Sequence, residues 1–221
     1  MHIPDGFLDP WVLAGCFVLA AAAIGFSSWR LNGRLDGARV PLLGVVSAGI
    51  FAAQMLNWPI PGGTSAHFVG GAFAAILLGP YLGCLAMASV VVVQAFVFGD
   101  GGVLALGANL LNMAVVDVFV GYALFRALVG LGETIAAFVA GWGAITVSAA
   151  AVGLQAGLSS TFAYDLTTTL TVMTAGHAVL GLVEGLITVL VVRYLLDVRP
   201  DLVLGLGGTD APADAVEEAA V

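Results

Sequence analysis

The sequence predicts an all-α polytopic membrane protein with about seven transmembrane helices. Of its 221 residues, 61% are hydrophobic and only 9% are charged, whereas soluble domains carry roughly a quarter charged residues. The mean hydropathy is +1.09, and long apolar runs alternate with turns that contain glycine and proline. This composition excludes a water-soluble globular protein.

Crossing a bilayer takes about 20 apolar residues in a helix. One run, residues 68–98, would be about 46 Å long as a single helix, which is too long for one span. It is interrupted by GPYLG at residues 79–83, so it predicts two short helices that either span or re-enter. The other five segments are expected at about residues 10–29, 41–58, 104–128, 134–154 and 171–196.

The basic residues predict the orientation, because cytoplasmic loops are enriched in Lys and Arg. The chain has no lysine, and its bases are Arg30, Arg34, Arg39, Arg126, Arg193 and Arg199. With seven crossings, all six lie on the cytoplasmic side if the amino terminus is outside and the carboxyl terminus cytoplasmic. No base precedes the first apolar run, so we do not expect a cleaved signal peptide. The expected location is the cell (inner) membrane, multi-pass.

Two regions are expected. Residues 1–200 form the transmembrane metal-binding and transport domain. Residues 201–221 contain five acids and no base, and their Gly, Pro and Ala content predicts a disordered cytoplasmic tail.

The chain begins MHIPDGFL, and a histidine at position 2 offers a particular chelate. The α-amine of Met1, the deprotonated amide nitrogen of His2 and the His2 Nδ1 can close five- and six-membered rings on one ion. Such planar nitrogen sites suit Ni²⁺ and Cu²⁺ and, less readily, Co²⁺. Pro4 and Gly6 would turn the chain back into the protein. The alternative is that His2 is an incidental terminal residue.

A fourth nitrogen can come from His67, which follows the turn IPGGTSAH on the same side as the amino terminus. His177 is expected about two turns into the last span, where it could orient or screen the ligands. The glycine-rich loop FGDGG can turn tightly and move, and we expect it to help close the site, with Asp100 near the entry. Otherwise His67 would be an ordinary polar group at a helix start.

Several stretches together resemble the CbiM/NikM family, the substrate-binding membrane components of energy-coupling-factor (ECF) transporters for cobalt and nickel. They are MHIPDGFL, PIPGGTSAHFVGG, QAFVFGDGGVLALGANLLNM and HAVLGLVEGLIT, and the resemblance covers about residues 1–196. It implies that Met1, His2 and His67 hold the metal.

The resemblance also implies partners: a transmembrane coupling subunit, cytoplasmic ABC-type ATPase subunits and a small accessory membrane subunit. A chain without lysine cannot carry the GxxxxGK[ST] phosphate loop, so ATP hydrolysis would belong to another chain. No enzyme activity, no cofactor besides the transported ion and no nucleic-acid partner are expected. The expected function is Co²⁺ import for cobalamin synthesis, because nickel members often carry an appended domain. Ni²⁺ import is the alternative.

Two acids, Asp117 and Glu184, fall inside predicted spans, where ionisable groups are usually functional. Glu184 lies seven residues after His177 and shares its helix face. With Gln94, Asn109 and Asn112 these acids could line a polar track, or they could form a structural hydrogen-bond network. A proton-driven secondary permease that uses both acids is therefore a competing function.

Close pairs of small residues predict helix contacts. Ala21 with Gly25, and Gly181 with Gly185, are candidates for the face that meets the coupling subunit. Packing within the chain is the alternative for each pair.

Overall fold

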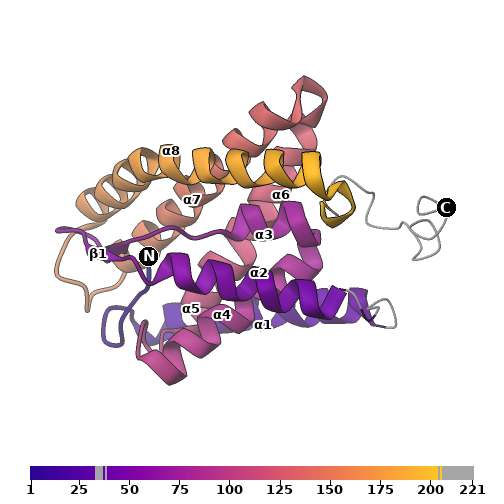
Figure 1. Cartoon of the computed structure of the whole chain (residues 1–221). Coiled ribbons are helices and arrows are strands. Elements are labelled where there is room, and N and C mark those ends of the chain that lie inside the picture. The colour runs from indigo at the N-terminus through magenta and orange to yellow at the C-terminus, as the bar shows by residue number, and fades with distance from the viewer. Residues whose placement is uncertain (33–36, 38, 204, 206–221) are drawn as a thin grey trace.

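The computed structural model describes residues 1–32, 37, 39–203 and 205, which form a bundle of helices (Figure 1). Arg34 and most of the predicted acidic tail lie outside the described residues. The α-helices are α1 (Pro10–Leu31), α2 (Arg39–Gln54), α3 (Gly71–Leu78), α4 (Pro80–Val93), α5 (Leu106–Asn109), α6 (Asp117–Leu128), α7 (Glu133–Gly157) and α8 (Leu166–Val198).

Short elements complete the bundle. The π-helical turns η1 (Gln94–Phe98) and η2 (Leu110–Val116) continue α4 and join α5 to α6, and the 3₁₀ turns are η3 (Val129–Leu131) and η4 (Pro200–Leu202). Strands β1 (Trp58–Pro59) and β2 (Ser65–Ala66) pair antiparallel, with Trp58 opposite Ala66 and Pro59 opposite Ser65. The hairpin is small, and the fold is mostly helical.

Five continuous helical segments are long and apolar enough to cross a membrane: Pro10–Leu31, Pro80–Phe98, Leu106–Leu131, Glu133–Gly157 and Leu166–Val198. The apolar helix α2 has 16 residues and α3 has eight. Together these are the seven predicted segments, and the chain is a multi-pass membrane protein.

The predicted interruption of the third apolar run is confirmed. Gly79 has a φ of 76°, a backbone conformation that favours glycine, and Pro80 begins α4 as its first residue. Helix α3 alone is about 12 Å long, too short to cross a bilayer. The extended chain after β2 therefore carries the segment into the bundle before α3 begins.

Small residues let α7 and α8 pack closely. A Cβ atom on Gly185 would lie 2.7 Å from the carbonyl oxygen of Phe138, and one on Gly181 would lie 2.9 Å from Ile145. Gly181 and Gly185 thus face α7, so they are not the face for the coupling subunit; the alternative of packing within the chain is correct for this pair. Ala21 is exposed, and Gly25 has open space around its Cβ position.

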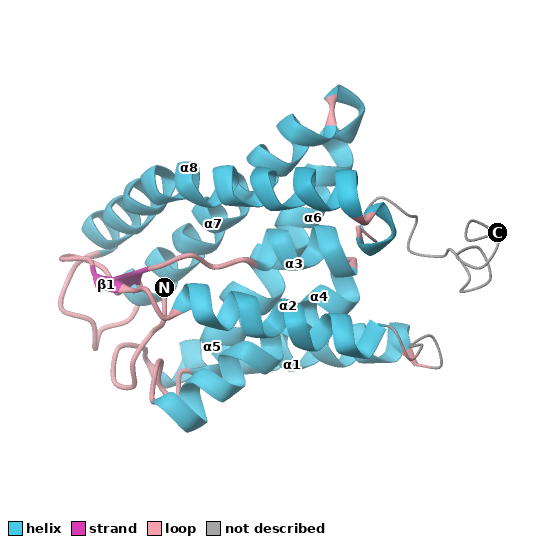
Figure 2. Cartoon of the chain, viewed as in Figure 1, coloured by secondary structure: helices cyan, strands magenta, loops and turns pink. Residues whose placement is uncertain are grey.

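The loops at one end of the bundle hold the amino terminus, the β-hairpin and the connection before α8 (Figure 2). Helix α8 ends at the opposite end of the molecule. Arg30 stacks over Tyr81, with its guanidinium carbon 5.3 Å from the ring centroid, and Arg126 donates to the carbonyl of Gly205 at 3.3 Å. These two arginines lie at helix ends remote from Met1, and the orientation in a membrane stays a prediction.

Candidate metal site

The first residues of the chain lie inside the bundle. Met1 and Ile3 are fully buried, and His2 is 4% exposed. The N–H of Ile3 donates to Asn109 Oδ1 at 2.8 Å. The carbonyl of Ile3 accepts hydrogen bonds from Asn109 Nδ2 at 3.1 Å and from the N–H of Gly102 at 2.9 Å. Asn109 therefore holds the backbone directly after His2 through both the N–H and the carbonyl of Ile3.

The glycine-rich loop after η1 packs against this segment. Asp5 Oδ1 accepts hydrogen bonds from the N–H groups of Leu104 at 2.8 Å and Ala105 at 3.0 Å. A Cβ atom on Gly102 would collide with the carboxylate and amide of Asp5, and one on Gly101 would lie 2.9 Å from Asn109 Nδ2. The close approach of the two chains therefore requires glycine at both positions.

The amino group of Met1 reaches the β-hairpin. It donates to the backbone carbonyl of Ser65 at 2.6 Å and contacts the hydroxyl of Ser65 at 2.9 Å. His67 follows Ser65 by two residues and is fully buried. Its ring lies nearly parallel to that of His2, with centroids 4.6 Å apart and an interplanar angle of 23°. The hairpin thus brings together Met1, His2 and His67.

The histidine rings leave three nitrogens without hydrogen-bond partners. His67 Nδ1 lies 2.7 Å from the carbonyl oxygen of Phe68, and His177 Nδ1 lies 2.8 Å from that of Met173. Because a carbonyl only accepts, both Nδ1 atoms carry hydrogen and both Nε2 atoms keep a lone pair. These Nε2 atoms, and Nδ1 of His2, are buried and have no partner. Such groups are unusual in folded proteins and call for a functional explanation.

Burial disfavours the charged form of each basic nitrogen in this region. It lowers the pKa of the Met1 amine, an effect that the negative charge of Asp100 opposes. The pKa of His2 falls to about 4 through burial and then through the nearby amine charge, while Asp100 and Gln94 act in the opposite direction. The pKa of His67 is lowered by burial and by the same amine. Both imidazoles are therefore neutral at pH 7 and able to donate lone pairs.

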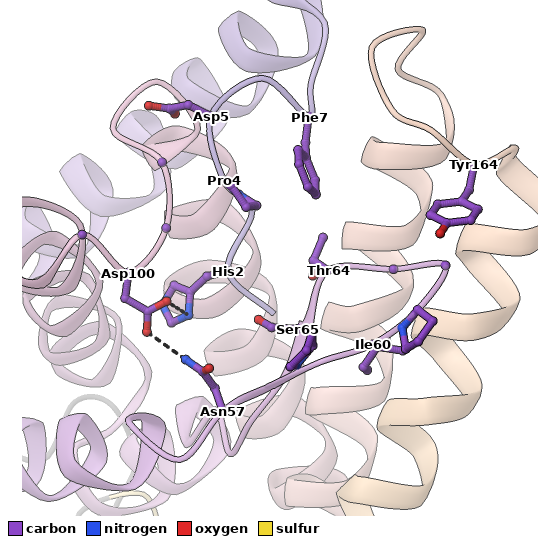
Figure 3. Close-up of a pocket in the computed structure, with 17 residues that line it drawn as sticks. His2, Pro4, Asp5, Phe7, Asn57, Ile60, Thr64, Ser65, Asp100 and Tyr164 are labelled. Carbon is purple, nitrogen blue, oxygen red and sulfur yellow. Dashed lines mark hydrogen bonds and ion pairs between the residues drawn. The ribbon is translucent and has the colours of Figure 1, made fainter.

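Asp100 lies beside His2 and is partly exposed. One carboxylate oxygen is 3.4 Å from His2 Nδ1, and the other accepts from Asn57 Nδ2 at 3.2 Å. Figure 3 shows both contacts at the edge of a cavity. The cavity has a volume of about 620 Å³ and is lined by the amino-terminal segment, the hairpin and the 99–102 loop. Asp100 and His2 thus both line the open cavity.

His177 lies one turn after Met173 on α8. The sulfur of Met173 accepts from the N–H of Thr64 at 3.4 Å, so this part of α8 packs on the hairpin that precedes His67. Over the described ranges, no group of three His, Cys, Asp or Glu side chains is arranged to hold a metal ion. A metal bound in this region would need main-chain nitrogens among its ligands.

Backbone amides and neighbouring side chains provide hydrogen-bond partners for polar residues within the spans. Glu184 accepts from the N–H groups of Val69 and Gly70, both at 2.8 Å, and Asp117 Oδ1 accepts from that of Ala72 at 3.2 Å. Asn112 exchanges two 2.8 Å bonds with Gln155. The interpretation as structural hydrogen bonding therefore describes these residues better than a single track.

Sequence reasoning missed two residues that contact this region. Gln54 is fully buried, and its Nε2 donates to the carbonyl of Val69 at 2.5 Å. The backbone carbonyl of Ser65 accepts a hydrogen bond from the Met1 amine. A lone glutamine in the apolar helix α2 was a signal for Gln54, whereas Ser65 is one of several small polar residues in its turn.

The sequence and the fold both match known metal transporters. The CbiM family, described as "Cobalt uptake substrate-specific transmembrane region", matches residues 2–202. A putative metal transport protein of Haloquadratum walsbyi is 63% identical, over 92% of this chain and 93% of the relative. A putative fused nickel transport protein NikMN of Archaeoglobus fulgidus is 55% identical, over 92% of this chain and 68% of the relative.

More distant relatives and solved structures agree. A putative cobalt transport protein CbiM of Methanococcus voltae is 31% identical, over 91% of this chain and 94% of the relative. The crystal structure of a transition metal transporter superposes with a TM-score of 0.87 at 35% identity, covering 90% of this chain and 93% of the other. A truncated transition metal transporter gives 0.85 at 36% identity, covering 89% and 99%. This chain belongs to the CbiM family and is a membrane component of cobalt and nickel transport.

Proposed function

We propose that this protein captures Co²⁺ or Ni²⁺ from the outer face of the membrane and passes it inward. The ligands are the Met1 amine, the amide nitrogen and Nδ1 of His2, and Nε2 of His67. The observation that carries the proposal is the convergence of the buried amine with two neutral imidazoles, each of which has one ring nitrogen without a hydrogen-bond partner. Binding of an ion would supply the missing partner for each of them.

The spacing of the two rings supports this ligand set. Two imidazoles in adjacent positions around one ion, each bound at about 2 Å, have centroids about 4.5 Å apart. The rings of His2 and His67 are 4.6 Å apart, but they are stacked with only 23° between their planes. The distance fits, and one ring must turn so that an ion can lie in both ring planes. The Met1 amine and the His2 amide complete a planar set of four nitrogens, the geometry that Ni²⁺ prefers.

Access to these ligands would run through the cavity beside Asp100. A carboxylate at the inner end of an open cavity attracts cations, and Asp100 also contacts His2. We propose that Asp100 draws the hydrated ion toward His2, while Asn109 holds the ligand segment in place. His177 lies on the α8 turn that supports the hairpin and acts on the ligands only through that packing.

Inward transfer would depend on other subunits. The chain contains no lysine, so it lacks the phosphate loop of an ATPase. We propose that a transmembrane coupling subunit, cytoplasmic ABC-type ATPase subunits and a small accessory membrane subunit drive the transport, in the cell (inner) membrane. The exposed Ala21–Gly25 face of α1 stays a candidate for contact with the coupling subunit.

Both ions remain in the proposal. A relative named for nickel transport, NikMN of Archaeoglobus fulgidus, is 55% identical to this chain. Two relatives named for cobalt transport, from Methanococcus voltae and Geobacter sulfurreducens, are 31% and 33% identical. Planar nitrogen ligands also bind Ni²⁺ more tightly than Co²⁺. We expect the purified protein to bind Ni²⁺ more tightly than Co²⁺. Co²⁺ import for cobalamin synthesis stays a prediction, which uptake measurements must decide.

The first test is the binding of Ni²⁺ and Co²⁺ to the purified native protein and to two variants. One has an alanine inserted between Met1 and His2, and the other is His67→Ala. Both should lose tight binding of either ion, whereas the matched control His177→Gln, which removes the third histidine, should retain most of it. Native affinity in both altered proteins would refute the proposed ligands.

The competing secondary permease requires proton transfer through Asp117 and Glu184. Both carboxylates accept hydrogen bonds from backbone amides at the start of α3, which favours a structural role. Metal uptake by this chain alone, in vesicles with a proton gradient and no ATPase, would overturn the ATP-driven proposal.

A further inference from the structure

Two buried glutamines connect His2 to the segment that carries His67. His2 Nε2 lies 3.0 Å from Gln94 Oε1. Gln94 Nε2 donates to Gln54 Oε1 at 2.8 Å, and Gln54 Nε2 donates to the carbonyl of Val69 at 2.5 Å. Both glutamine side chains are fully buried in otherwise apolar helices. The relay thus runs from His2 through Gln94 and Gln54 to Val69, two residues after His67.

The chemistry of the last group fixes the direction of every bond in the relay. The carbonyl of Val69 can only accept, so Gln54 must turn its amide NH₂ toward it. The carbonyl of Gln54 then faces Gln94 and accepts from the Gln94 NH₂. Only the carbonyl of Gln94 remains for His2. That carbonyl can only accept, and it lies 3.0 Å from Nε2, whereas the other acceptor, the Asp100 carboxylate, is 3.4 Å from Nδ1. The shorter contact is the hydrogen bond, so His2 Nε2 carries the hydrogen.

The far end of the relay is itself held in place. The N–H of Val69, on the other side of the same residue, donates to Glu184 Oε2 at 2.8 Å. The peptide backbone at Val69 is therefore fixed by α8 through its N–H and by α2 through its carbonyl. Because the backbone at Val69 cannot turn, the donor and acceptor groups of both glutamine amides are also fixed, up to the carbonyl that faces His2.

We propose that Gln94 and Gln54 are positioning residues that set the tautomer of His2. With hydrogen on Nε2, the lone pair is on Nδ1, the nitrogen that the chelate with the Met1 amine requires. The inference rests on the proposed function for its purpose, but the tautomer of the metal-free protein can be measured on its own. The relay also holds His2 in register with the segment that carries His67.

A purely space-filling role for the glutamines predicts a different result. Buried amides that only satisfy one another would tolerate any variant of equal size, and His2 could adopt either tautomer. Hydrogen bonds that orient a metal-binding histidine typically change metal affinity by about tenfold to a hundredfold when removed. The experiment must therefore change the hydrogen-bonding groups of the glutamine side chains while keeping their volume.

The experiment records ¹⁵N spectra of metal-free protein labelled at histidine, in which protonated and unprotonated ring nitrogens are resolved. The chain contains three histidines, and single His→Gln variants assign their signals. The native protein should show His2 with hydrogen on Nε2. A native His2 with hydrogen on Nδ1 would overturn the inference.

Variants then test the consequence for binding. Gln94→Met has a similar volume but no acceptor, so His2 should lose its fixed tautomer and Ni²⁺ affinity should fall by about tenfold or more. Gln94→Glu, in the neutral form that burial favours, keeps an acceptor for His2 Nε2 and an O–H donor for Gln54 Oε1. It should therefore keep the tautomer and most of the affinity. Gln54→Met should resemble Gln94→Met more weakly, because Gln94 then becomes free to turn.

The matched control is Gln155→Met, which breaks an amide–amide pair with Asn112 away from the histidines. It should leave both the His2 spectrum and the Ni²⁺ affinity unchanged. Native affinity in Gln94→Met would overturn the inference. If the native protein shows the expected tautomer and binds neither Ni²⁺ nor Co²⁺, the proposed function fails while the tautomer assignment stands.

Discussion

Glu184 holds Val69 from the middle of α8: its Oε2 accepts the Val69 N–H at 2.8 Å, and its Oε1 accepts the next N–H, of Gly70, at the same distance. Glu184 is 1% exposed. The extended chain between β2 and α3 contains His67, so Glu184 fixes the backbone on which that ligand is carried. An acid buried in a span here serves as an acceptor for two backbone donors.

Replacing Glu184 by glutamine should loosen this segment. Glutamine has one acceptor oxygen, so its NH₂ group would face one of the two backbone donors. Leaving a buried donor without a partner costs about 1–3 kcal/mol. We expect Glu184→Gln to lower the thermal unfolding temperature and to weaken Ni²⁺ binding, measured by a fluorescence melt and by calorimetric titration. An unchanged melt and affinity would show that the two bonds are dispensable.

Gly102→Ala should displace the amino-terminal segment without disturbing the helices. The new methyl group would collide with Asp5, whose carboxylate anchors the segment on Leu104 and Ala105. We expect a loss of metal affinity with nearly native helical content by circular dichroism. Gly15→Ala is the matched control, since the Cβ position of Gly15 has open space, and it should bind metal like the native protein.

Asn109→Ala should expose the amino group of Met1. The substitution leaves the N–H of buried Ile3 without its acceptor, at a cost of about 1–3 kcal/mol, and it frees the segment that carries His2. Because the chain has no lysine, its α-amine is the primary amine that an amine-reactive reagent can modify. We expect slow labelling in the native protein and labelling at least several times faster in Asn109→Ala. Equal labelling rates in the two proteins would show that Asn109 does not hold the amino-terminal segment in place.

His2 should lower the stability of the metal-free protein on acidification. His2 has a folded pKa of about 4 against 6.5 for the free group. The unfolded chain therefore binds more protons between these values, and the free energy of unfolding falls as the pH drops from 6.5 to about 4. The lowered pKa of the Met1 amine acts in the same direction below its ordinary value of 8.0. Thermal melts as a function of pH would measure the slope.

His2→Gln is the control for this pH dependence. It removes one titrating group and should flatten the curve between pH 6.5 and 4 while leaving the slope at higher pH. The same pH dependence of melting in the native protein and in His2→Gln would contradict the burial of neutral His2.

The sequence predicted the helical segments well because apolar length and chain breakers are local properties. Gly79 and Pro80 interrupt the third run where expected. The boundaries differ where local polar groups intervene. Helix α8 begins at Leu166 rather than near 171, because the Asp165 carboxylate caps it by accepting the N–H of Thr168 at 3.0 Å. Helix α3 begins at Gly71 rather than 68, because the preceding amides bind Glu184.

The candidate site was only partly predictable. Position 2 and the GTSAH turn indicated His2 and His67, and the structure brings these rings together. The Gln54–Gln94 contact joins residues 40 apart, and the Val69–Glu184 contact joins residues 115 apart. Such pairings depend on how helices pack, and neither periodicity nor motif spacing contains that information.

The long sequence separations within the site have a consequence for biosynthesis. The Met1 amine bonds to a residue 64 positions away, Ile3 to one 106 positions away, and Val69 to one 115 positions away. Contacts of such high sequence separation form late, because the intervening chain must first be brought together. The start of the chain, although the first part to leave the ribosome, is therefore expected to wait unpaired until α5 has entered the membrane. The ion-binding pocket is completed only after α8 has been inserted.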